Sequence, residues 1–178
     1  MGNDVIQDWQ GNNIALRPGS YWHLMPTNGG LIRNNARVGK GVLYSVSAIA
    51  ALPGLSQAVT PYFLGAFNQP REIVWEKARP PALPSRLKSF YCFESKDLAE
   101  RAAREWFGNE LRTPLELRIA TTARVHRCDA KLLEAPEVDW QMSAERYWKG
   151  EMTEKPFPET LVHGAVYFPD WEQFPIGF

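Results

Sequence analysis

The residues best suited to chemistry are a histidine near the start of the chain, His23, and a glutamate near its end, Glu159. An imidazole hydrogen-bonds through either ring nitrogen, and a carboxylate can stabilise a positive charge that develops during a reaction. Between them, segment 84–93 carries Ser89 and Tyr91 in a strand-like pattern. The three features together suggest a nucleotide site, and in particular one that splits NAD.

Each of these features also has an ordinary structural explanation, which the sequence leaves open. A histidine such as His23 on an aromatic strand is often a structural residue with satisfied hydrogen bonds. A carboxylate such as Glu159 at the entrance of a strand is often simply exposed. Residues 85–86 follow a proline run, so they could form a turn whose arginine pairs with Glu72 or Glu76.

The bulk composition narrows the class of protein. At 178 residues the chain is expected to form a single domain, 1–178, with an irregular segment over residues 1–18. Twenty basic and twenty acidic residues give a net charge of zero, which removes the simple argument for a nucleic-acid or membrane-surface binder. No signal pattern opens the chain, and no apolar stretch reaches the roughly 20 residues that span a bilayer. We therefore expect a soluble protein.

The sequence lacks the common metal and phosphate motifs. Two cysteines, Cys92 and Cys128, and three histidines are too few and too widely spaced for a disulfide scaffold or a structural zinc site. There is no G-x-G-x-x-G, P-loop, G-x-S-x-G or H-E-x-x-H pattern. We therefore expect no metal.

The periodicity of apolar residues predicts an α+β domain. Alternating patterns predict strands at 19–25, 87–93, 115–120, 123–128 and 159–168. Helical spacing predicts helices at 42–52, 55–67, 71–79, 96–107 and 143–150, with a loop over 132–138. Ser95 or Glu94 is expected to cap the helix 96–107. The elements do not alternate as βαβ units, which favours α+β over a parallel doubly wound sheet.

Four segments occur in a recognisable order: Tyr21-Trp22-His23, Glu72 with Arg79, 83–93 with the Ala-containing helix that follows, and 144–150 leading to 159–164. In this order they cover most of residues 19–168 and resemble the ADP-ribosyltransferase superfamily. The closer resemblance is to bacterial ADP-ribosyltransferase-like domains of toxin and phage-defence systems. It implies split antiparallel sheets around an NAD cleft, with inserted helices.

The resemblance also implies roles for individual residues, of which three would be catalytic. His23 would hydrogen-bond the adenosine ribose of NAD, and Tyr91 would stack on the nicotinamide. Glu159 would accept a hydrogen bond from the nicotinamide ribose and stabilise the oxocarbenium ion that forms as nicotinamide leaves. Further contacts to NAD are expected from Ser85, Ser89, Arg33, Arg86 and Tyr147, the arginines because a planar fork suits the pyrophosphate.

Two departures from the family pattern affect the expected substrate. Position 157 is Phe, where arginine-modifying members carry a second acidic or amide residue, so arginine is a less suitable acceptor. The helix after Tyr91 lacks a second tyrosine, and Tyr147 or Trp148 is the expected substitute.

The resemblance implies a mono-ADP-ribosyltransferase that attaches ADP-ribose from NAD to RNA, DNA or protein, as a toxin or phage-defence effector. The alternatives are an NAD glycohydrolase and a catalytically silent binding domain. NAD would be the co-substrate, and a toxic chain would need an antitoxin or immunity protein. We expect the protein to act in the cytoplasm, either of the cell that produces it or of a target cell into which it is delivered. We expect no membrane partner.

Overall fold

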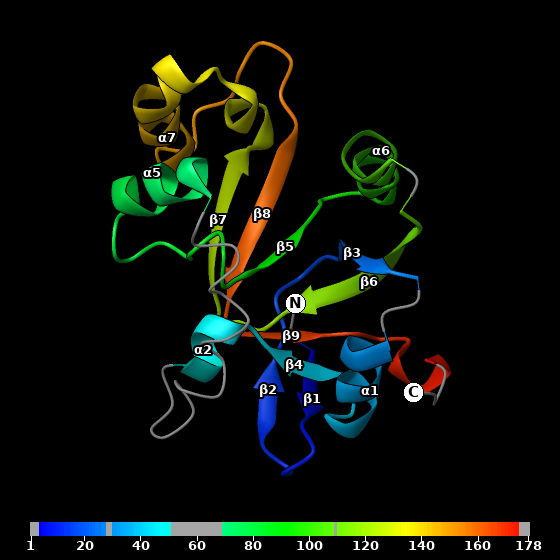
Figure 1. The fold of residues 1–178 in the computed structure, drawn as a ribbon. Helices are drawn as coiled ribbons and strands as arrows, with labels where there is room; N and C mark the ends of the chain where they lie inside the picture. Colours follow the sequence, from blue (N-terminus) through cyan, green and yellow to red (C-terminus); the bar gives the residue numbers. More distant parts are fainter. Residues whose placement is uncertain (1–3, 28–29, 51–68, 109, 175–178) are drawn as a thin grey trace. The chain divides into compact units, whose positions relative to one another are not determined.

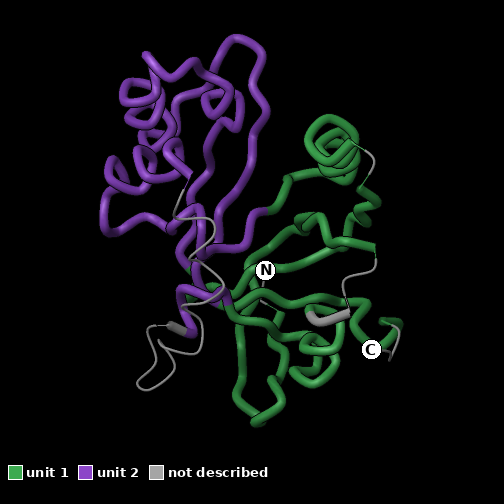
Figure 2. Tube along the Cα trace, in the orientation of Figure 1, with its two compact units in different colours: residues 1–44, 92–123, 165–178 green, residues 45–91, 124–164 purple. Residues whose placement is uncertain are grey.

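The computed structural model describes residues 4–27, 30–50, 69–108 and 110–174. These residues form antiparallel strand pairs and separate helices, which confirms the predicted α+β class (Figure 1). The chain divides into two compact units, each assembled from separate stretches of sequence (Figure 2). Unit 1 comprises residues 1–44, 92–123 and 165–178, and unit 2 comprises residues 45–91 and 124–164. Whether the two units act as one domain stays a prediction.

A β-hairpin forms in unit 1 where the sequence analysis expected an irregular N-terminal segment. Strands β1 (Val5–Gln7) and β2 (Asn13–Ala15) pair antiparallel. The carboxylate of Asp8 closes the turn between them by accepting hydrogen bonds from the backbone N–H groups of Gln10 and Asn12, at 2.9 and 2.8 Å. The polar residues of this segment therefore encode a turn, which corrects the prediction.

The larger sheet of unit 1 has the strand order β3-β6-β9-β4. Its strands are β3 (Tyr21–Pro26), β4 (Val42–Tyr44), β6 (Arg112–Ile119) and β9 (Ala165–Tyr167). Strands β3 and β6 confirm the strands predicted at 19–25 and 115–120. His23 lies within β3, opposite Leu115 of β6.

Strand β4 lies where a helix was predicted over 42–52. It pairs with β9, and Val42 lies opposite Tyr167. The local periodicity of apolar residues cannot predict hydrogen bonds to a strand that is distant in the sequence, which is why the prediction was wrong. The helix α2 (Val46–Ala50) occupies only part of the predicted range. The remainder of that range and the predicted helix 55–67 lie outside the described residues.

The described residues of unit 1 form two α-helices, α1 (Gly30–Val38) and α6 (Lys96–Phe107). Helix α6 confirms the prediction for 96–107, and the hydroxyl of Ser95 accepts a hydrogen bond from the N–H of Leu98 at 3.2 Å, as an N-cap should. Ala99 and Ala102 are buried where α6 packs on β3 and β6. The apolar stripe read from the sequence is therefore the face that meets the sheet.

A three-stranded sheet has the order β5-β8-β7 and belongs to unit 2, apart from Cys92 at the end of β5. Strands β7 (Arg124–Asp129) and β8 (Pro158–His163) pair along their full length, which places Cys128 opposite Glu159. Strand β7 confirms the strand predicted at 123–128. Strand β5 (Phe90–Cys92) is shorter than the predicted strand 87–93, because residues 86–88 form a turn instead.

The strand predicted at 159–168 is two strands. Strand β8 ends at His163, and β9 begins at Ala165 in the other sheet and the other unit. Gly164 separates them with a φ of 132° and donates its amide to the hydroxyl of Ser45 at 2.9 Å. The apolar alternation of residues 159–168 continues across Gly164, so the sequence pattern did not indicate that the strand ends there. Glycine is the residue that adopts this backbone conformation without strain.

Helices α5 (Pro70–Ala78) and α7 (Trp140–Trp148) pack against each other in unit 2. The indole N–H of Trp148 donates to the carbonyl of Trp75 at 2.7 Å, and the buried Trp75 ring meets Tyr147 edge-on. Both helices confirm predicted ones, at 71–79 and 143–150, although α7 begins earlier. The predicted loop 132–138 instead contains two short 3-10 turns, Ala130–Glu134 and Glu137–Asp139.

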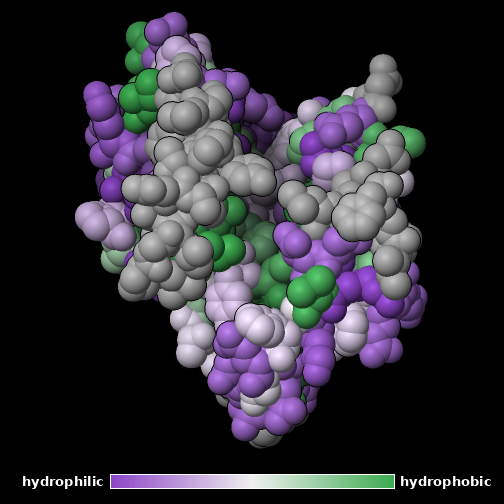
Figure 3. Space-filling model, turned by 60° about the horizontal axis from the view of Figure 1, so that its bottom comes forward, coloured by the Kyte–Doolittle hydropathy of each residue, from purple (hydrophilic) through white to green (hydrophobic). Residues whose placement is uncertain are grey.

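Polar and apolar residues are interspersed on the face of the molecule in Figure 3. Among the described residues, no helix is long and apolar enough to cross a membrane. Within the same ranges, no group of three or more His, Cys, Asp or Glu side chains is placed to hold a metal ion.

Candidate functional site

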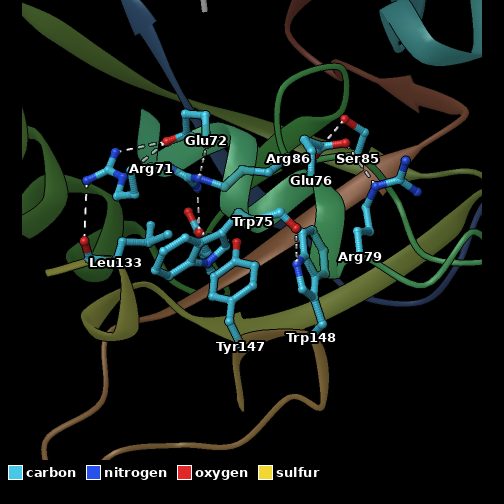
Figure 4. A network of polar contacts seen from close by, with 11 residues as sticks. Arg71, Glu72, Trp75, Glu76, Arg79, Ser85, Arg86, Leu133, Tyr147 and Trp148 are labelled. Carbon is cyan, nitrogen blue, oxygen red and sulfur yellow. Dashed lines mark hydrogen bonds and ion pairs between the residues drawn. The ribbon is translucent and has the colours of Figure 1, made fainter. Parts of the chain in front are cut away.

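Glu159 belongs to a buried polar network in unit 2 and contacts Arg86 and Tyr147 there. Figure 4 shows these two partners with the residues around them. The Glu159 side chain is 1% exposed, and its Oε1 atom accepts hydrogen bonds from Arg86 Nη1 at 2.8 Å and from the Tyr147 hydroxyl at 2.7 Å. No hydrogen bond from a described residue reaches Oε2. A buried carboxylate is stable only when its charge is compensated, and these two donors supply that compensation.

Arg86 reaches Glu159 from the turn that precedes β5. The turn is held by the carboxylate of Glu76, which accepts hydrogen bonds from the Ser85 hydroxyl at 3.0 Å and from the Arg86 backbone N–H at 3.2 Å. The Arg86 Nε atom lies 3.5 Å from Glu72 Oε2. The structural reading of residues 85–86, a turn whose arginine pairs with Glu72, is therefore confirmed.

Two carboxylates fix the charge of Arg86. Burial alone would lower the pKa of its guanidinium, but the negative charges of Glu159 and Glu72 outweigh burial and raise that pKa above its ordinary value. Arg86 is therefore a permanent cation that both glutamates share.

Tyr147 supplies the second hydrogen bond to Glu159 from helix α7. The residue is fully buried, and burial together with the charge of Glu159 raises the pKa of its hydroxyl well above the ordinary value. The phenol is therefore neutral, and it donates its proton towards the carboxylate. The predicted contact between Tyr147 and nicotinamide stays a prediction, but the hydroxyl already has this partner.

The network continues from Glu72 to the surface. Arg71 Nη2 lies 2.9 Å from Glu72 Oε1, and Arg71 Nη1 donates to the carbonyl of Leu133 at 3.3 Å. The result is a chain of alternating charges, Arg71–Glu72–Arg86–Glu159, whose net charge is zero. Such a chain holds the Glu159 carboxylate in one orientation.

Several buried polar atoms of unit 2 lack a hydrogen bond within the described part of the chain. They are Glu72 Oε2, Arg86 Nε, the Trp75 indole nitrogen and the Ser89 hydroxyl. Glu72 Oε2 and Arg86 Nε face each other as an ion pair at 3.5 Å. Native proteins leave few buried polar groups unpaired, so the Trp75 and Ser89 groups call for an explanation such as a bound ligand or water. Ser89 was predicted to contact NAD, and its buried hydroxyl lies just before β5.

Asp129 holds the chain that leads into Glu159, and sequence reasoning did not identify it. It is fully buried and accepts hydrogen bonds from the backbone of Lys131, Thr153 and Phe157 and from the Thr153 hydroxyl. Burial tends to raise the pKa of Asp129, but these hydrogen bonds, led by those from Thr153, lower it below its ordinary value. Asp129 therefore fixes the loop before β8, which carries Glu159.

The remaining predicted residues lie on other elements. His23 on β3 is 6% exposed, and Arg33 on α1 donates to the carbonyl of Thr27 at 2.5 Å. Both belong to unit 1, whereas Glu159 belongs to unit 2. Tyr91 lies on β5 with a partly exposed side chain. The structure thus joins Glu159 to two of the predicted residues, Arg86 and Tyr147.

Glu72 belongs to the segments that resemble the superfamily and was a possible partner of Arg86, but its burial was not predicted. One signal was available: Glu72 and Glu76 are four residues apart on a predicted helix, directly before the proline run that bears Arg86. Residues at this spacing share one helix face, so both carboxylates were able to face the same arginine-bearing turn.

Comparison with known proteins shows the family to which the chain belongs. A family model described as a protein of unknown function (DUF2441) matches residues 54–170. This stretch contains Glu159, Arg86, Tyr147 and Glu72, whereas His23 and Arg33 precede it. No curated protein matches the chain.

Proposed function

We propose that this chain, which belongs to the DUF2441 family of proteins of unknown function, is a mono-ADP-ribosyltransferase that uses NAD as its co-substrate. The observation that carries the proposal is the Glu159 carboxylate, which Arg86 and Tyr147 hold in a fixed orientation through a single oxygen. The order of the sequence segments, which resembles that superfamily, supports it. The acceptor would be a macromolecule, either nucleic acid or protein.

In this proposal Glu159 acts on the nicotinamide ribose. Its Oε2 atom would accept a hydrogen bond from the 2′-hydroxyl, and its charge would stabilise the oxocarbenium ion as the bond to nicotinamide breaks. Arg86 and Tyr147 act on Glu159 and are positioning residues. A carboxylate that is already oriented needs no reorganisation during the reaction, which is the source of this kind of catalysis.

The other predicted contacts complete the proposed NAD site. His23 would bind the adenosine ribose, Tyr91 would stack on nicotinamide, and Ser89 would hydrogen-bond it. Ser85 and Arg33 would lie along the ribose and pyrophosphate. The proposed fold is the split arrangement of antiparallel sheets around an NAD cleft. The proposed setting is a toxin or phage-defence system, with an antitoxin or immunity protein as partner.

A second candidate is a catalytically silent binding domain. The observation that favours it is the burial of Glu159, whose side chain is 1% exposed and already paired with a cation. A carboxylate in this state is also what a purely structural ion pair requires. The two functions differ in whether NAD is consumed.

The test is nicotinamide release from NAD by the purified full chain, together with transfer of labelled ADP-ribose to RNA, DNA and protein of a bacterial lysate. Glu159→Gln should lower the rate of release by about 100- to 1000-fold, because the fixed negative charge is lost. Glu134→Gln, which changes an exposed residue on a 3-10 turn, is the matched control and should retain the wild-type rate.

Each outcome of this test decides between the candidates. Free ADP-ribose without a labelled macromolecule would identify a glycohydrolase. If the folded wild-type chain neither releases nicotinamide nor labels any lysate component, the transferase proposal is wrong and the binding domain is favoured.

A further inference from the structure

A second polar cluster lies in unit 2 and is formed by Ser45, Ser47 and His163. The Ser47 hydroxyl on helix α2 is 2.7 Å from Nδ1 of His163, the last residue of β8. The Ser45 hydroxyl is 3.2 Å from that of Ser47. Ser47 and His163 are both partly exposed.

This cluster is separate from the Glu159 network. His163 and Glu159 are both on β8 and project from the same face, since alternate residues of a strand share a face. Four residues along a strand correspond to about 13 Å. The two clusters are therefore too far apart for a single reacting atom to contact both.

The hydrogen bonds of the cluster have a defined direction. The Ser45 hydroxyl oxygen accepts from the N–H of Gly164 at 2.9 Å and from that of Ala48 at 3.4 Å. A hydroxyl has two acceptor positions, so the proton of Ser45 is left to point at the Ser47 oxygen. The proton of Ser47 is then directed at Nδ1 of His163, which must be unprotonated.

The charges around His163 favour that unprotonated state. Arg124 lies opposite His163 in the β7–β8 pairing, and Arg79 also acts on the ring. Burial and the positive charges of these two arginines lower the pKa of His163 below its ordinary value. The imidazole is therefore neutral at pH 7 and can accept a proton.

We propose that Ser47 is a nucleophile that takes an acyl group from small carboxylic esters, with His163 as its general base and Ser45 as a positioning residue. A serine hydroxyl within hydrogen-bond reach of a neutral imidazole is the arrangement that activates such a nucleophile. Arg124, which lies opposite His163, favours esters that carry a negative charge. Neither NAD nor Glu159 takes part.

The reaction has two balanced steps. The Ser47 oxygen bonds to the acyl carbon, the Ser47 proton passes to His163 Nδ1, and the alcohol leaves with the electrons of the ester bond and with that proton. Water then attacks the acyl-Ser47, loses a proton to His163 and releases the carboxylic acid. The proton returns from His163 to Ser47, which restores the site.

A fluorophosphonate probe tests the nucleophile directly. Its phosphorus should bond to Ser47 with loss of fluoride, and mass spectrometry of the full chain after digestion should find the adduct on that residue. Ser47→Ala should abolish labelling, and His163→Gln should slow it by about 100-fold. Ser20→Ala, another partly buried serine with a side-chain partner, is the control and should label like wild type.

Ester hydrolysis gives the second measurement. The p-nitrophenyl ester of a dicarboxylic acid should be cleaved faster than p-nitrophenyl acetate, and Arg124→Gln should reduce that preference. An adduct on a different residue, or a Ser47→Ala chain that is folded and still labels at the wild-type rate, would overturn the proposal. An unlabelled wild-type chain would overturn it as well.

Discussion

Arg86 and Glu159 are 73 residues apart in the sequence, yet Arg86 Nη1 lies 2.8 Å from Glu159 Oε1. The glutamate side chain is 1% exposed and the arginine side chain 22% exposed, so the pair sits at the edge of the interior of unit 2. The attraction between two such charges is largely offset by their desolvation, whereas the loss of one partner leaves the other uncompensated. Stability should therefore depend on the pair being intact.

Arg86→Met should destabilise the chain strongly, by about 3–5 kcal/mol, because Glu159 would stay buried without its cation. The double variant Arg86→Met, Glu159→Leu should lose much less free energy of unfolding than the sum of the losses in the two single variants. The free energy of unfolding from urea titrations of all four chains measures this coupling. Additive costs would show that the ion pair contributes little.

Tyr147→Phe should lower the free energy of unfolding by about 1.5–3 kcal/mol, the usual range for a hydrogen bond to a charged group. The substitution removes only the hydroxyl that donates to Glu159 and leaves the ring contacts with Trp75 in place. Tyr44→Phe is the matched control, since Tyr44 is 42% exposed. Equal stability of the two variants would mean that the Glu159 carboxylate does not need this donor.

Asp129→Asn should destabilise the chain and remove part of its acid sensitivity. Because hydrogen bonds hold the pKa of Asp129 below its ordinary value, the folded state favours the carboxylate. That stabilisation is present above the unfolded pKa of about 3.9 and is lost as pH falls through the lower folded pKa. Unfolding curves between pH 2 and pH 7 should show a shallower acid slope for the variant than for wild type.

His126 should make stability depend on pH in the mildly acidic range. Its Nε2 donates to the carbonyl of Tyr147 at 3.1 Å, and its ring stacks on Trp148. Burial lowers the pKa of His126 below its ordinary value, although the hydrogen bond opposes that shift. The unfolded chain therefore binds more protons, and the free energy of unfolding should fall as pH drops below about 6.5.

The variant His126→Gln isolates this contribution. Its free energy of unfolding should change less between pH 7 and pH 5 than that of wild type. The difference between the two pH profiles is the measurement, since other groups contribute equally to both. Parallel profiles would show that His126 keeps its ordinary pKa in the folded chain.

The sequence by itself determined the elements whose causes are local. Helix α6 was predicted at its observed bounds, because Ser95 caps it and a stripe of small and apolar residues runs along one face. Strand β3 and helix α5 were also predicted from local signals, because turn residues and prolines lie on both sides of each element. Local hydrogen bonds and periodicity suffice for such elements.

Only the tertiary structure decided which distant residues meet. The break at Gly164 depends on Ser45, which lies on a different segment and takes up the glycine amide. The ion pair of Glu159 depends on a turn that Glu76 holds, and the partner of His163 is a serine on α2. None of these contacts follows a periodic pattern in the sequence. They arise from the packing of strands and helices, and that packing depends on the whole fold.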